Sequence, residues 1–104
     1  MSRIGSYIKF TAHPGQRDAL VEHLLAAANS VSSLAGCELY IINTSPTEPD
    51  VVWVTEVWSS PADRDAPLTA EGASASIQQV LSLLAAPPER IDVLPIGGKG
   101  LIRK

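Results

Sequence analysis

The stretch Val51–Trp58 constrains the fold of this chain more than any other segment. It is rich in β-branched and aromatic residues, which is typical of a β-strand. Strand side chains alternate between two faces, so one row starts at Val51 and the other at Val52. Both rows are largely apolar. A strand of this kind belongs to a sheet that is covered on both faces.

Hydrophobic periodicity places the remaining elements around this strand. Alternation with a period of two predicts three more strands, over residues 3–11, 37–43 and 91–96. Apolar residues at steps of three and four predict helices over residues 16–31 and 74–84. A short helix between them is capped by Ser59 or Ser60 and opened by Pro61. The predicted order is β-α-β-β-α-α-β.

This order predicts an α+β fold of the ferredoxin-like, split βαβ kind. Right-handed crossovers place the helices on one face of a four-stranded antiparallel sheet. The 104 residues form a single domain, 1–104. The opposite face, which carries Val51, Trp53 and Val57, then stays uncovered. We expect a homodimer joined through the Trp53 face, because a second copy would bury this apolar surface.

Composition excludes several kinds of partner. The net charge is −3 and the eight Lys and Arg residues are scattered, so no basic stripe for nucleic acid is present. No apolar run is long enough to cross a membrane, and residues 1–9 do not resemble a signal peptide. With a single cysteine, Cys37, the expected location is the cytoplasm.

Motifs for bound cofactors are also missing from the sequence. His13 and His23 lack the carboxylate spacing of a metal site, so we expect no metal. Residues 97–100 look like a phosphate loop, but no helix can follow them, and they are interpreted as a terminal turn. The sequence therefore predicts that no cofactor is needed.

Glu56 and Trp58 are the most informative polar pair. Alternation places both side chains on the face that the helices cover. A buried carboxylate without a partner is costly, so Glu56 needs a hydrogen-bond donor or a raised pKa. It could tie down a loop, or it could act as a base for a phenolic ligand that stacks on Trp58.

The segment from Trp53 to Ser60 resembles the antibiotic biosynthesis monooxygenase family, as does the tail Leu94–Leu101. The resemblance implies a dimeric α+β barrel. It also implies oxidation of a phenol, a quinol or an aromatic polyketide by O₂ without metal or flavin. The chain departs from the family pattern at two positions. Pro67 stands where many members have His, and Val54 stands where oxygenases of aromatic polyketides have Asn.

The leading hypothesis is a cofactor-independent monooxygenase acting on a small aromatic substrate. The alternatives are a non-catalytic ligand-binding protein and an isomerase or cyclase that uses the same apolar pocket. The candidate catalytic residues are Glu56, Trp58 and His23. The candidate substrate-binding residues are Trp58, Val54, Val52, Asn43 and Gln78. Tyr7 and Tyr40 are expected on the Trp53 face, and residues 63–65 are expected to form a solvated helix surface.

Overall fold

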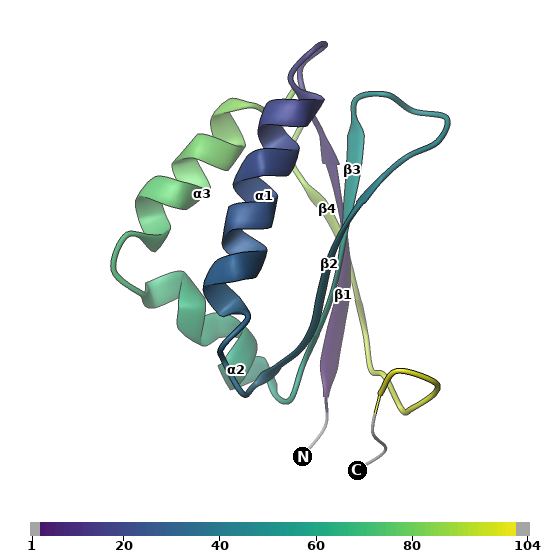
Figure 1. The fold of residues 1–104 in the computed structure, drawn as a ribbon, viewed down its shortest axis with the longest axis vertical. Helices are drawn as coiled ribbons and strands as arrows, with labels where there is room; N and C mark the ends of the chain where they lie inside the picture. The colour runs from purple at the N-terminus through teal and green to yellow at the C-terminus, as the bar shows by residue number, and fades with distance from the viewer. Residues whose placement is uncertain (1–2, 102–104) are drawn as a thin grey trace.

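The computed structural model describes residues 3–101. Its elements in chain order are β1 (Ile4–Thr11), α1 (Arg17–Val31), β2 (Cys37–Thr44), β3 (Val51–Trp58), α2 (Pro61–Asp65), the 3₁₀ helix η1 (Ala66–Thr69), α3 (Ala73–Ser82) and β4 (Glu89–Val93). The strands form one antiparallel sheet in the order β2-β3-β1-β4. All helices lie on one side of it (Figure 1). The predicted α+β, ferredoxin-like fold is confirmed.

The hydrophobic core lies between α1 and the middle of the sheet. Val52 and Val54 of β3 are 0% and 1% exposed and pack with Phe10 of β1. Leu20 and Leu24 reach them from α1. Their spacing of four residues puts both leucines on one side of the helix. The row of β3 that begins at Val52 therefore faces the helices, as its alternation predicts.

The final strand differs from the prediction in its bounds. It spans Glu89–Val93 rather than 91–96, and it pairs with β1 as far as Gly5. Beyond this point the tail crosses the sheet, where a Cβ on Gly5 would lie 3.0 Å from Pro95 Cγ. Pro95 lacks an N–H for further pairing, so apolar residues past Val93 leave the sheet. The predicted turn at the tail is present, with a bridge between Gly98 and Leu101.

The face of the sheet opposite the helices is only partly covered. Tyr7, Ile41 and Ile91 on this face are 45%, 45% and 59% exposed. Val57 is only 5% exposed, because the C-terminal tail folds across this part of the sheet. The tail forms the hooked segment beside the lower end of the sheet in Figure 1. Most of the open face is therefore apolar and without cover from the described residues.

Candidate active site

Glu56 and Trp58 lie side by side on the helix-facing row of β3. Their side chains are buried, with Glu56 8% and Trp58 3% exposed. The indole Nε1 of Trp58 donates a hydrogen bond of 3.2 Å to Oε1 of Glu56. Among residues 3–101 this is the hydrogen bond that the Glu56 carboxylate accepts. The carboxylate is thus fixed at one oxygen and leaves Oε2 as an acceptor.

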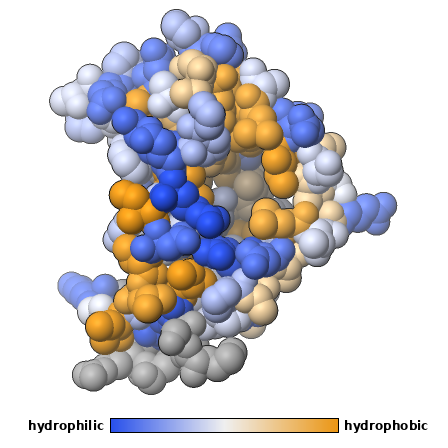
Figure 2. Space-filling view, turned by 180° about the vertical axis from the view of Figure 1, so that it is seen from behind, coloured by the Kyte–Doolittle hydropathy of each residue, from blue (hydrophilic) through white to orange (hydrophobic). Residues whose placement is uncertain are grey.

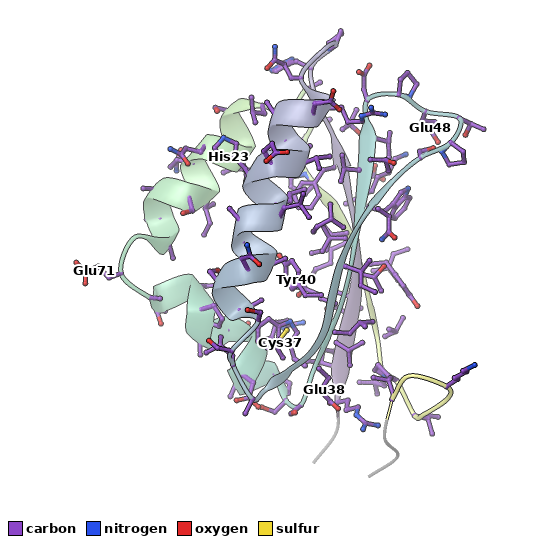
Figure 3. The ribbon with its side chains drawn as sticks, in the orientation of Figure 1. His23, Cys37, Glu38, Tyr40, Glu48 and Glu71 are labelled. Atoms are coloured by element: carbon purple, nitrogen blue, oxygen red, sulfur yellow. The ribbon has the colours of Figure 1, made fainter. Side chains whose placement is uncertain are left out.

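Two neighbouring strands place further polar side chains beside Glu56. Ser6 of β1 and Tyr40 of β2 are its direct cross-strand partners. Directly opposite residues of an antiparallel pair share a face, so both belong to the helix-facing side. Figure 3 shows Tyr40 between α1 and the sheet. The expectation that Tyr40 lies on the Trp53 face was wrong, because its partner in the sheet is Glu56.

Burial dominates the electrostatics of these groups. It raises the pKa of Glu56 above its ordinary value of 4.5, and the charge of Asp92 acts in the same direction. The hydrogen bond from Trp58 and the charges of Arg64 and Arg90 oppose the shift. Burial, and then the charge of Glu56, raises the pKa of Tyr40 to about 12. Tyr40 therefore remains a protonated hydrogen-bond donor at neutral pH.

A cluster of charged side chains lies on the β4 side of this site. Oδ1 of Asp92 accepts a hydrogen bond of 2.9 Å from Ser6 Oγ and pairs with Arg90 Nε at 3.1 Å. Arg64 reaches the same oxygen from α2, with its Nη1 at 3.6 Å. Its side chain is only 17% exposed, so its assignment to a solvated helix surface was wrong. The run of charged residues at 63–65 does not show that Arg64 points inward, because the direction of its side chain depends on how α2 packs against the sheet.

The docking of α2 follows from two local features. Ser60 caps the helix by accepting a hydrogen bond of 3.2 Å from the Asp63 backbone N–H, and Pro61 occupies the first turn. Gly36 lies against Asp63 so closely that a Cβ there would be 2.5 Å from Asp63 Cγ. Gly36 therefore allows α2 to approach the sheet and direct Arg64 toward Asp92.

Two predicted site residues lie away from Glu56. His23 of α1 is half-buried and lies on the side of the helix that faces α3 (Figure 3). Gln78 of α3 is exposed. Neither contacts Glu56 or Trp58 through a hydrogen bond. The structure does not bring them to the site.

The other three predicted substrate-binding residues, Val52, Val54 and Asn43, belong to the core or to the open face of the sheet. Val52 and Val54 are closed within the core and leave no surface for a ligand. Asn43 pairs with Trp53 and so lies on the open face, where its Nδ2 donates to Trp53 O at 3.1 Å and Thr55 Oγ1 at 3.2 Å. The site that the structure assembles consists of Glu56 and Trp58 with Ser6, Tyr40, Arg64 and Asp92, which the sequence analysis did not place there.

The surface has two hollows near this region. Seen from the β4 side, the molecule is hollowed between the helical layer and the sheet, with apolar residues around the hollow and a strongly hydrophilic band beside it (Figure 2). A cavity of about 330 Å³ lies between the open face and the tail, and its lining includes Ser6 and Glu56. Tyr7, Val57, Pro95 and Lys99 line it. Only the first hollow lies on the side of the sheet that carries Trp58.

Within residues 3–101, no group of three or more His, Cys, Asp or Glu side chains is arranged to hold a metal ion. No helix in this part of the chain is long and apolar enough to cross a membrane. The expectation that no metal or other cofactor is needed stays a prediction.

The fold and the site define a small ferredoxin-like α+β protein with a buried carboxylate and indole on the helix-facing side of its sheet. The family model for antibiotic biosynthesis monooxygenases matches residues 3–78. The chain therefore belongs to the antibiotic biosynthesis monooxygenase family. Members of this family are typically dimeric proteins that bind small molecules.

Solved structures agree with this assignment. A candidate antibiotic biosynthesis monooxygenase from Chloroflexus aurantiacus is 39% identical, with 93% of this chain and 96% of that chain covered and a TM-score of 0.83. A candidate member from Caulobacter crescentus is 20% identical, covers 92% of each chain and has a TM-score of 0.84. A Mycobacterium tuberculosis protein is 21% identical, with coverages of 94% and 99% and a TM-score of 0.82. The last two support the fold alone. No curated protein matches the chain significantly.

Proposed function

We propose that this protein is a cofactor-independent monooxygenase that oxidises a phenolic, quinol or aromatic polyketide-type small molecule with O₂. The observation that carries the proposal is the buried Glu56 carboxylate, held by Trp58 at 3.2 Å with one oxygen left as an acceptor. Burial raises the pKa of Glu56, which makes its carboxylate a stronger base toward a phenolic proton. Family membership supports the same class of reaction.

The proposed reaction begins with transfer of the phenolic proton to Glu56. The phenolate passes one electron to O₂, and the resulting superoxide and substrate radical combine to form a carbon–oxygen bond. Cleavage of the O–O bond leaves one oxygen atom in the product and releases the other as water. The substrate supplies the four electrons, and apolar surroundings limit loss of the reactive oxygen species to solvent.

Tyr40 and Trp58 have separate roles in this proposal. Tyr40, whose pKa is about 12, donates a hydrogen bond toward the oxygen of the substrate. Trp58 orients Glu56 and offers its ring as one wall for a planar substrate. In this structure the ring is only 3% exposed, so substrate binding requires the helical layer above it to move.

We also propose that the functional form is a homodimer joined through the Trp53 face. The apolar side chains exposed there support it, since Tyr7 and Ile41 are each 45% exposed. Tyr7 and Ile41 both pair with Thr55, which lies two residues from Trp53 on β3, so they share a face with Trp53. A second copy seated on this face would cover them.

A second candidate function is non-catalytic binding of a small aromatic molecule. It is favoured by the close packing of Trp58. It is also favoured by Pro67 of η1, which stands where many members of the family have His. The experiment that separates the two functions uses 1,4-naphthohydroquinone in air and under argon. The monooxygenase forms hydroxylated quinone only with O₂ and faster than the enzyme-free mixture. A binding protein shifts the ligand spectrum equally under both gases and forms no such product.

A further inference from the structure

The side chain of Arg64 is buried without an acceptor for all of its hydrogens. Its Nε is 3.3 Å from Asp65 Oδ1, and its Nη1 is 3.6 Å from Asp92 Oδ1. The second distance permits an ion pair but not a hydrogen bond. Among the described residues, the buried Nη1 has no hydrogen-bond partner. A charged donor left in this way costs stability, and such groups call for a functional explanation.

Asp92 cannot satisfy Arg64 because its near oxygen is already occupied. Ser6 Oγ donates to Oδ1 of Asp92 at 2.9 Å, and Arg90 Nε lies 3.1 Å from the same atom. Two guanidinium groups thus share one carboxylate oxygen with a hydroxyl group. The cluster leaves Arg64 as the cation with hydrogen-bonding capacity to spare.

Arg64 is connected to the Glu56 site through Asp92, with its Nη1 3.6 Å from Asp92 Oδ1. Its charge, like that of Arg90, lowers the pKa of Glu56. Ser6 links Glu56 to Asp92, since it pairs across the sheet with both residues. The Arg64 guanidinium is therefore connected, through Asp92 and Ser6, to the carboxylate that acts on the substrate in the proposed reaction. Because Asp92 belongs to β4, this connection lies on the β4 side of the site.

We infer that Arg64 binds a carboxylate on the substrate, and that the substrate is therefore an acidic phenol rather than a neutral one. This inference rests on the proposed function of the Glu56–Trp58 site. The phenolic end of the ligand lies at Glu56, and its carboxylate replaces the missing acceptor at Arg64. A guanidinium group suits this role, because its planar fork can hold a carboxylate through two parallel hydrogen bonds.

The test compares two probes that differ only in charge, 6-hydroxy-2-naphthoic acid and 6-hydroxy-2-naphthamide. Their dissociation constants are measured by calorimetry at pH 7.5 on the wild type and on Arg64→Gln. Arg17→Gln, which alters a partly exposed arginine of α1 paired with the exposed Asp18, is the matched control. We expect the acid to bind at least about tenfold more tightly than the amide to the wild type and to Arg17→Gln. Arg64→Gln should abolish that preference by weakening acid binding alone.

Each outcome bears on the inference separately from the proposed function. Equal binding of acid and amide to the wild type overturns the inference, and the proposed function survives if Trp58→Phe weakens both probes. An acid preference that persists in Arg64→Gln also overturns it. Failure of both probes to bind overturns both proposals. If Arg64→Gln does not fold, Arg64→Lys replaces it, and partial loss of the preference is expected because the charge remains without the fork.

Discussion

Nε1 of Trp58 lies 3.2 Å from Oε1 of Glu56, and the two residues stand two positions apart on one face of β3. The hydrogen bond favours the ionised form of Glu56 and so lowers its pKa, whereas burial raises it. It also fixes the carboxylate orientation in the site. The first two predictions follow from this pair.

Stability should depend on pH through Glu56. Because burial raises its pKa in the folded state, ionisation is easier in the unfolded chain. The contribution of Glu56 to stability is therefore fully present below the ordinary pKa of 4.5 and is lost as pH rises through the raised value. The groups that face Glu56 and contribute to this shift are Trp58, Arg64, Arg90 and Asp92.

Urea unfolding of the wild type and Glu56→Gln between pH 4 and pH 8 measures this effect. The free energy of unfolding of Glu56→Gln should rise relative to that of the wild type with increasing pH, and then level off. A constant difference between the two proteins across this range would show that Glu56 has no raised pKa.

Trp58→Phe should keep the fold but change the acid limb of the activity profile. The phenyl ring fills most of the indole space, so we expect a loss of about 1–3 kcal/mol in stability. The variant lacks the Nε1 donor that lowers the pKa of Glu56, so this pKa should rise further. The pH profile of kcat/KM measures it. An acid limb at the wild-type pH contradicts the assigned role of the hydrogen bond.

Gly36→Ala should loosen the attachment of α2. The new Cβ would lie 2.5 Å from Asp63 Cγ and 2.7 Å from Asp63 Cβ, so the start of the helix must shift. We expect a loss of about 1–3 kcal/mol in the free energy of unfolding. Asp63→Ala removes the nearer of these atoms and should recover part of that loss in the double variant. If the two substitutions prove additive, the close approach of Gly36 to Asp63 has no energetic effect.

Trp53→Glu should disrupt the proposed dimer. The substitution removes the largest apolar side chain of the proposed interface and puts a carboxylate between the cross-strand neighbours Lys9 and Asn43, on the face that exposes Tyr7 and Ile41. Sedimentation velocity at micromolar concentration should show a dimer for the wild type and for Trp53→Phe, and monomer or unfolded chain for Trp53→Glu. A monomeric wild type at this concentration would rule out the proposed assembly.

The fold could be predicted from the sequence because local patterns specify it. The β3 alternation correctly places Glu56 and Trp58 on the helix-facing side. The sequence also predicts a short helix capped by Ser59 or Ser60, and in the structure the cap is Ser60. Each of these features depends on the sequence of one segment, in which the period of two or the capping residue can be recognised directly.

The rest of the site depends on how segments pair. Tyr40 reaches Glu56 through the register between β2 and β3, which shifts between Cys37 and Leu39. Asp92 reaches Ser6 through a strand that starts two residues earlier than its apolar pattern indicates. The position of Arg64 follows from the approach of α2. None of these long-range relationships has a periodic signal within one segment.

Incorporation of oxygen from ¹⁸O₂ into product shows directly whether this protein is a monooxygenase. Wild type and Glu56→Gln, both treated with chelator, are mixed with 1,4-naphthohydroquinone, and the hydroxylated quinone is analysed by mass spectrometry. The account predicts one ¹⁸O atom per product molecule and a rate lower by roughly two to four orders of magnitude in Glu56→Gln. Absence of ¹⁸O above the enzyme-free mixture, or equal rates for the two proteins, would contradict it.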